Sequence, residues 1–389
     1  MANIRTNLTL LLLFFSFSIF SQNEKVAFKL FSFEDGLSHR NAFKIQQDQE
    51  GYIWIATING LNKYDGKKFT HFSNLSEENK IPQNYISELL VTPDSNIWMA
   101  GENYLIALDG KTYESKTIGA KKESALYKKT RTLSSLTRDD KGNIWTITYH
   151  NESGSYYLQK TDSDDELQDV LKLEGDFGSR GMIWTNGHLF FASKENEILK
   201  IERQGKVKGQ YNFGERTNKN WVIQMQATSD GTIWALLNDG RLFYLEKDET
   251  QFLIHPVIKS TLGETIANCF LVEENGDIWI GGSGNLYFYE KKSDRVYEYS
   301  DNVKDLTKHY FNIRDLFQDR MGVIWAASEY GVVKITNAER LFNNYLSERS
   351  EFCKNGFCSI RGITEDDNGN IYFSSVSYTH LTLPTKAYV

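Results

Sequence analysis

Residues 36–66 read GLSHRNAFKIQQDQEGYIWIATINGLNKYDG. An alternation of apolar residues begins at Phe43, and Asp48, Gly51 and Trp54 follow it. Alternating apolar residues predict a half-buried strand. An aspartate followed by a glycine predicts a tight turn, because aspartate accepts hydrogen bonds from nearby backbone N–H groups and glycine adopts positive φ. The stretch therefore predicts short strands joined by hairpin turns.

The turn and the aromatic strand recur along the chain, which is the signature of a repeat architecture. Trp184 would leave uneven gaps of 39 and 50 residues, whereas Phe190 in TNGHLFFAS keeps a glycine, Gly187, three residues before it. Phe190 is therefore taken as the fourth anchor. The eight anchors lie 44 to 47 residues apart, and they are Trp54, Trp98, Trp145, Phe190, Trp234, Trp279, Trp325 and Tyr372.

Each repeat has room for four strands, and twisted four-stranded sheets stacked around an axis form a propeller. We expect an all-β fold: a seven-bladed β-propeller of four-stranded antiparallel blades, followed by the start of a second propeller. The anchors should pack between blades. The strand at residues 26–33 has no blade of its own. We predict that it pairs with Val332–Ile335 and closes the ring, because this removes the open sheet edges.

The composition excludes several functions. The net charge of −7 is spread over mixed signs, so no basic stripe predicts nucleic-acid binding. The acidic turns at residues 139–143 and 365–370 lack the twelve-residue pattern of a calcium loop, and no metal or cofactor is expected. Of the three cysteines, Cys269 lies in an apolar stretch and is expected in the core, whereas Cys353 and Cys358 are close enough in sequence to pair.

The N-terminus predicts a signal peptide, and the C-terminus predicts a second propeller that is cut short. Arg5 precedes a short apolar run, so residues 1–21 are expected to be a signal peptide. The propeller is then assigned to residues 22–339 and the first blade of a second, truncated propeller to 340–376. The tail at 377–389 does not continue the repeat and is expected to be non-native.

The stretch at residues 36–66 resembles the two-component regulator propeller family. The resemblance extends over about residues 26–375 and is degraded in the second and fourth repeats, where Ser95 replaces the turn glycine and Phe190 replaces the tryptophan. It implies the periplasmic sensor region of a hybrid two-component histidine kinase, commonly a sensor of oligosaccharides. The kinase and the inner-membrane anchor would lie in sequence beyond this chain. We expect a homodimer of the full-length protein, and no catalytic residue in this part.

A ligand would be bound at the mouth of the propeller, where loops enter the inner strands. Amide side chains and aromatic faces suit an uncharged polar ligand. The alternatives are a scaffold for protein partners and a carbohydrate-active propeller enzyme, because a fold by itself does not determine function. The candidate residues are Arg40, Asn41, Asn84, Asn220, Trp221, Asn268, His309, Tyr310 and Asn312.

Overall fold

The structure is a computed structural model that describes residues 26–101, 105–118, 130–150, 153–161, 166–173, 181–193, 197–213, 221–258, 266–337, 360–365, 371–375 and 382–383. The predictions for residues 1–21, Asn220, Cys353, Cys358 and the tail at 377–389 lie largely or wholly outside these ranges. The chain divides into two compact units, Met1–Thr336 and Asn337–Val389.

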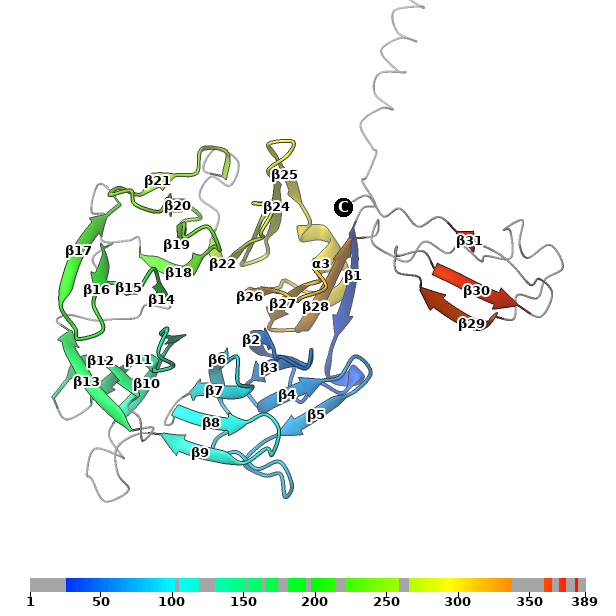
Figure 1. Ribbon diagram of the computed structural model, residues 1–389, viewed down its shortest axis with the longest axis horizontal. Coiled ribbons are helices and arrows are strands. Elements are labelled where there is room, and N and C mark those ends of the chain that lie inside the picture. Colours follow the sequence, from blue (N-terminus) through cyan, green and yellow to red (C-terminus); the bar gives the residue numbers. More distant parts are fainter. Residues whose placement is uncertain are drawn as a thin grey trace, which may run out of the picture. The chain divides into compact units, whose positions relative to one another are not determined.

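The first unit is a ring of seven four-stranded antiparallel sheets (Figure 1), which confirms the predicted all-β, seven-bladed propeller, while the start of a second propeller stays a prediction. Blades 1 to 3 are β2(Ala42–Gln47), β3(Ile53–Thr57), β4(Gly60–Tyr64) and β5(Phe69–Phe72); β6(Ile86–Val91), β7(Asn96–Gly101), β8(Leu105–Asp109) and β9(Ser115–Ile118); and β10(Thr130–Arg138), β11(Ile144–His150), β12(Ser155–Thr161) and β13(Leu167–Leu173).

Blades 4 to 6 continue the same order. They are β14(Met182–Thr185), β15(His188–Ala192), β16(Glu197–Ile201) and β17(Val207–Asn212); β18(Val222–Ala227), β19(Ile233–Leu237), β20(Leu242–Leu245) and β21(Leu253–Ile254); and β22(Ala267–Val272), β23(Ile278–Gly282), β24(Leu286–Glu290) and β25(Arg295–Glu298). The seven inner strands contact one another in a closed circuit, since β26 of blade 7 touches both β22 and β2.

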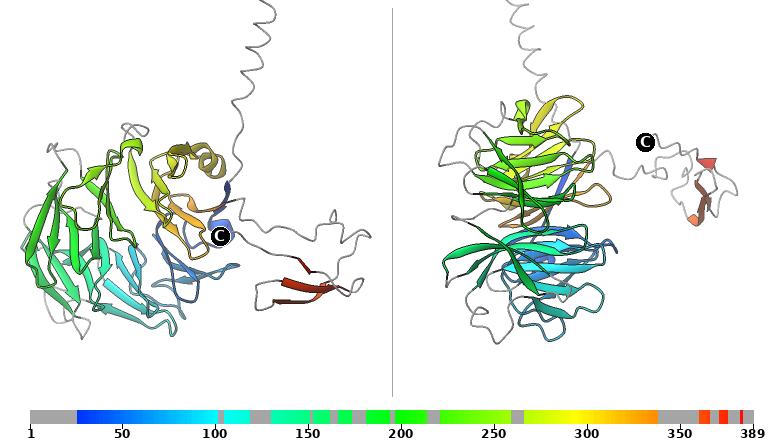
Figure 2. Two further views of the ribbon diagram at one scale, coloured as in Figure 1. Left: turned by 45° about the horizontal axis from the view of Figure 1, so that its top comes forward. Right: turned by 60° about the vertical axis from the view of Figure 1, so that its left-hand side comes forward.

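Blade 7 contains β26(Ile313–Gln318), β27(Ile324–Ser328), β28(Gly331–Asn337) and the N-terminal strand β1(Val26–Phe31). The strand order β1-β28-β27-β26 confirms the predicted closure of the ring, and the views in Figure 2 show β1 beside blade 7. A Cβ on Gly331 would lie 2.2 Å from the Phe31 carbonyl oxygen, just as one on Gly60 would lie 2.0 Å from that of Phe72. β1 is thus the outer strand of blade 7, as β5 is of blade 1.

Short helices interrupt the strands. The 3-10 helix η1(Phe33–Asp35) follows β1, and α3(Ser300–Thr307) lies between blades 6 and 7. Val303 of α3 is buried, and the helix contacts β1 and β24. The second unit contains one antiparallel sheet of β29(Ile360–Glu365), β30(Ile371–Ser375) and β31(Thr382–Leu383), in which the backbone of Tyr372 pairs with Thr364 and Thr382.

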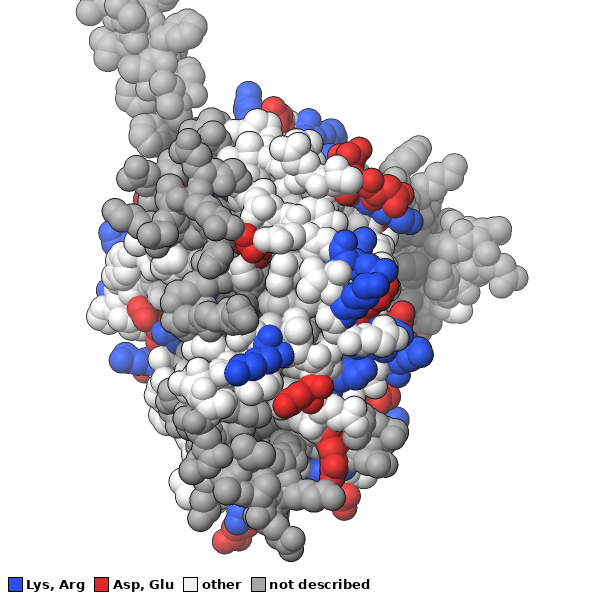
Figure 3. Space-filling model, turned by 90° about the vertical axis from the view of Figure 1, so that its left-hand side faces the viewer, with Lys and Arg blue, Asp and Glu red and all other residues white. Residues whose placement is uncertain are grey.

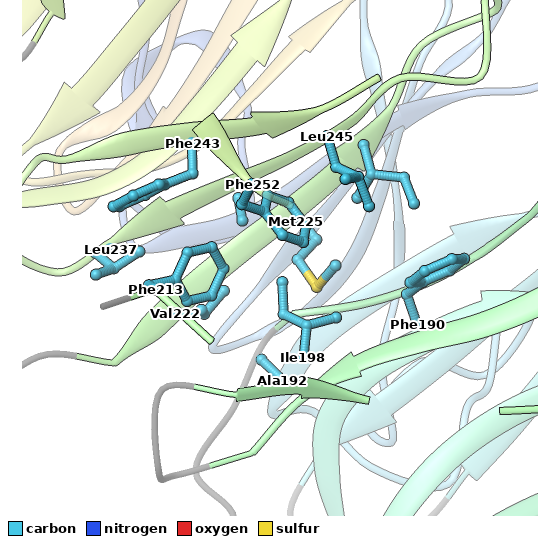
Figure 4. Packing of buried hydrophobic residues seen from close by; sticks show 12 residues of the cluster. Phe190, Ala192, Ile198, Phe213, Val222, Met225, Leu237, Phe243, Leu245 and Phe252 are labelled. Atoms are coloured by element: carbon cyan, nitrogen blue, oxygen red, sulfur yellow. The ribbon is translucent and has the colours of Figure 1, made fainter. Parts of the chain in front are cut away.

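The hydrophobic core is divided among the spaces between neighbouring blades. Figure 4 shows the packing between blades 4 and 5, where Phe190 lies in one cluster with Met225 and Phe252. Phe190 stands in the second strand and pairs with Lys200, as Trp54 pairs with Lys63. Trp184 lies in the first strand of blade 4. Cys269 is buried as expected, at 1% exposure.

One contact repeats at the hairpin turn between the first and second strands. The indole Nε1 of Trp54 donates a hydrogen bond to the Asp48 carboxylate, six residues earlier, at 2.7 Å. Trp145, Trp279 and Trp325 make the same bond to Asp139, Glu273 and Asp319 at 3.2, 2.8 and 2.9 Å. These acids therefore hold the buried indoles as well as the turns. A buried polar group needs such a partner, because leaving it unpaired costs about 1–3 kcal/mol.

Candidate functional site

The two ends of the ring are formed by different connections between strands. We call the end with the hairpin turns between first and second strands the turn face, and the opposite end, where loops enter the inner strands, the mouth. The mouth also contains the turns between second and third strands, such as Ile58–Asn59 in blade 1 and Glu329–Tyr330 in blade 7. The candidate ligand residues that the structure describes all lie at the mouth.

The inner strands of five blades carry a β-bulge at the mouth. The register shifts by one residue in each of these strands, which leaves one residue outside the regular pairing. Bulges re-aim side chains. The bulged residues are Phe43, Ser87, Ile223, Asn268 and Arg314.

Side chains of blades 6, 7, 1 and 2 are linked along one part of the mouth. Asn268 donates a hydrogen bond to the side-chain oxygen of Asn312, and the Arg314 guanidinium donates one to that of Asn41. The Arg314 guanidinium also lies 4.7 Å from the centre of the Phe43 ring, which is 5.3 Å from that of Tyr85. We call the six residues Asn268, Asn312, Arg314, Asn41, Phe43 and Tyr85 the mouth arc.

A stack of side chains lies beside the mouth arc. The ring of His309 is stacked on Tyr330 with centroids 5.1 Å apart, and the Arg40 guanidinium lies 5.4 Å from the centre of the same Tyr330 ring. His309 and Arg40 are exposed. Tyr310, next to this stack, is 67% exposed. The exposed surface here therefore combines a cation with aromatic rings, while Glu329 lies 3.7 Å from Arg314.

The remaining candidates are at the mouth but outside the arc. Asn84 receives a hydrogen bond from Gly60 N at 2.7 Å and donates one to Asn59 at 3.2 Å. Trp221 is 47% exposed, and its backbone exchanges two hydrogen bonds with Asn238. These contacts fix the loops of blades 1, 2 and 5, so Asn84 has a local structural role there.

The candidates predicted from sequence do not include Phe43, Tyr85, Arg314, Glu329 or Tyr330. Tyr330 and Glu329 follow the anchor Trp325 by five and four residues, as Asn59 follows Trp54 by five. In these two blades the turn between second and third strands follows the anchor at the same spacing, so the anchor register would have located both residues. The position of the Arg314 side chain could not be predicted, because a bulge breaks the alternation by which the two faces of a strand are assigned.

The arrangement provides recognition groups. Amide, guanidinium and aromatic side chains can orient an uncharged polar ligand through hydrogen bonds and stacking. Among the described residues, no group of three His, Cys, Asp or Glu side chains is placed to hold a metal ion. On the side of the ring drawn in Figure 3, the described Lys and Arg side chains are scattered together with Asp and Glu.

Comparison with known proteins places the repeat in a family. Residues 36–59 match the family model described as two component regulator propeller, so the chain carries this repeat. A histidine kinase, P4, of Formosa agariphila is 38% identical over 78 residues, which are 20% of this chain and 6% of that kinase.

Several solved structures share the fold. The extracellular domain of a putative hybrid two component system of B. thetaiotaomicron is 19% identical with a TM-score of 0.60, over 89% of this chain and 46% of that domain. A streptogramin B lyase is 16% identical with a TM-score of 0.63, over 80% of this chain and 97% of the lyase. This chain thus spans less than half of that extracellular domain. In the part of the chain that the structure describes, no helix is both long enough and apolar enough to cross a bilayer.

Proposed function

We propose that this chain is the exported, periplasmic ligand-sensing region of a hybrid two-component sensor, and that it recognises an oligosaccharide at the mouth of the propeller. The mouth arc carries the proposal. It joins Asn41 and Phe43, which lie inside the matched repeat, to Arg314 in the last blade and to Asn312 in the loop that enters that blade. A ligand that bridges these residues would contact both the first and the last blade.

The chemistry of the mouth favours a sugar. Hydroxyl groups of a pyranose both donate and accept hydrogen bonds, which suits the amides of Asn268 and Asn312 and the guanidinium of Arg314. The apolar face of a sugar ring can pack on an aromatic ring such as that of the exposed Tyr310. Signalling to a kinase and attachment to the inner membrane would belong to further parts of the protein, and we propose a homodimer for the whole sensor.

Calorimetric titration of the chain with a panel of neutral and uronic-acid oligosaccharides tests this proposal. We expect one class to bind, and we expect Arg40→Ala to weaken it by about tenfold, since truncation of an arginine in a contact typically costs 1–2 kcal/mol. Arg295→Ala, an exposed arginine on the outer strand β25, is the matched control and should bind normally. No binding by any sugar, or cleavage of the bound sugar, would contradict the proposal.

A further inference from the structure

Each anchor faces one residue of the third strand, and this residue normally covers the anchor ring. In four blades it is a lysine, whose Nζ lies 5.4 to 5.7 Å from the ring centre: Lys63, Lys160, Lys200 and Lys334. In blades 5 and 6 it is aromatic, and Tyr244 and Phe288 lie 5.3 and 4.6 Å from Trp234 and Trp279.

Blade 2 departs from this rule. Trp98 pairs with Ala107, so a methyl group stands where other blades place a lysine or an aromatic ring. The acid of the turn is also replaced, because Thr92 occupies the position of Asp48. Thr92 therefore has no carboxylate like the one that accepts the indole hydrogen bond of Trp54. The turn itself is altered as well, since Ser95 adopts a φ of 66° where the other blades use glycine.

A pocket of about 470 Å³ opens at this place on the turn face, between blades 2 and 3. Trp98 and Ala107 contribute to its lining, together with the two turns of blade 2 and with Arg138 and Gly142 of blade 3. The volume suits a small ligand. It lies at the opposite end of the ring from the mouth arc, so it is separate from the site proposed above.

Carboxylates dominate the charge of the pocket. Asp94, Asp109 and Glu114 line it, against the two cations Lys116 and Arg138. Backbone N–H groups of Thr112 and Lys111 lower the pKa of Asp109. Burial by itself would raise the pKa of Asp94, but hydrogen bonds from Thr92 and Asn96 outweigh it and the pKa is lowered. Both carboxylates are therefore ionised at neutral pH.

We propose that this pocket binds a small organic cation, a primary ammonium group carried on an aliphatic chain or on a sugar ring, in the place that lysine occupies in the sister blades. The C–H groups of the ligand would cover the Trp98 ring as a lysine stem does, and the ammonium would be attracted by the ring and the carboxylates. Trp98 can contact this ligand because Ala107 is much smaller than the lysine of the sister blades and both residues line the pocket.

Calorimetric titrations with cadaverine and with glucosamine test the proposal, and 1,5-pentanediol and N-acetylglucosamine are their uncharged counterparts. We expect at least one amine to bind, its uncharged counterpart to bind about tenfold more weakly, and the affinity to fall as salt is added. Binding of cadaverine alone would indicate a chain amine as the ligand class, and binding of glucosamine alone would indicate an amino sugar.

Ala107→Lys is the decisive variant, because it restores the residue of four sister blades and should fold. It should reduce binding by about tenfold or more, whereas Gln251→Lys, which adds the same charge at an exposed position in blade 5, should leave binding unchanged. Asp94→Asn should weaken binding without filling the pocket and so provides a second test. Absence of amine binding, equal binding of the uncharged counterparts, or unchanged binding by Ala107→Lys would overturn the proposal.

Discussion

The turn face and the mouth belong to the same seven blades, yet they are built by opposite rules. On the turn face the contacts recur: four indoles donate to an acid six residues earlier, and four lysines cover an anchor ring. At the mouth the contacts differ from blade to blade, and the arc is found in only one part of the ring. Recurring residues are thus explained by stability, whereas residues that depart from the repeat are the candidates for recognition.

Replacement of an anchor should cause the largest loss of stability. Trp145 is fully buried and stacked on Trp184 at 5.8 Å, so Trp145→Ala should lower the free energy of unfolding by about 3–5 kcal/mol. The matched substitution at the mouth, Trp221→Ala, removes a half-exposed ring and should cost less than about 0.5 kcal/mol. Urea denaturation of both variants compares the two ends directly, and equal losses would contradict the division between them.

Removing the acid of a turn should have an intermediate effect. Asp139 accepts hydrogen bonds from Trp145 and Asn143 and from Arg203 at 3.0 Å. Asp139→Asn should cost about 1–3 kcal/mol, because the remaining amide cannot satisfy all these donors. Asp140→Asn, at the exposed neighbouring position, should cost less than about 1 kcal/mol as a surface pair.

The effect of Asp139→Asn should also depend on pH. Burial alone would raise the pKa of Asp139, but hydrogen bonds from Asn143, Trp145 and Arg203 lower it below its ordinary 3.8. A depressed pKa stabilises the fold above the unfolded-state value, and this contribution is lost as the pH falls through the folded-state value. The difference between wild type and Asp139→Asn should therefore be constant from neutral pH to about pH 5 and shrink below about pH 4. A difference that grows in acid would be inconsistent with this role.

Restoring the hydrogen bond of the anchor indole in a blade that lacks it should have the smallest effect on the free energy of unfolding. Blade 5 has Thr228 in place of the acid, and the buried Nε1 of Trp234 has no hydrogen-bond partner in the described structure. Thr228→Asn would place an amide oxygen near this N–H and should raise the free energy of unfolding by about 1 kcal/mol. Thr228→Val, which adds no acceptor, should not stabilise the protein. If the two variants unfold alike, the indole bond has no part in stability.

Much of the fold could be predicted because the turn and the anchor of each repeat fix the positions of its strands. Phe190 was identified by Gly187 three residues earlier, and β1 by its lack of a blade. The mouth was predicted less completely. Arg314 reaches Asn41 and Phe43 only because a bulge moves it out of alternation and because the last blade lies beside the first. Such contacts between residues more than 270 positions apart leave no local signal.

The pocket over Trp98 was missed for a similar reason. Thr92, Ser95 and Ala107 could each be read as a weakened repeat, but the pocket also needs Arg138 and Gly142 from the next blade. The cavity thus depends both on the substitutions in blade 2 and on the residues of blade 3 that lie beside them. Departures from a repeat are therefore informative only when the neighbouring repeat is considered with them.

We propose that the recurring contacts of the turn face stabilise the fold and that residues of the mouth bind the oligosaccharide, and one paired measurement distinguishes these two roles. Asp139→Asn and Arg40→Ala would each be examined by urea denaturation and by titration with the bound oligosaccharide. We expect Asp139→Asn to lower stability with unchanged affinity. We expect Arg40→Ala to lower affinity about tenfold, with stability changed by less than about 0.5 kcal/mol. Loss of affinity in Asp139→Asn, or full affinity in Arg40→Ala, would contradict this proposal.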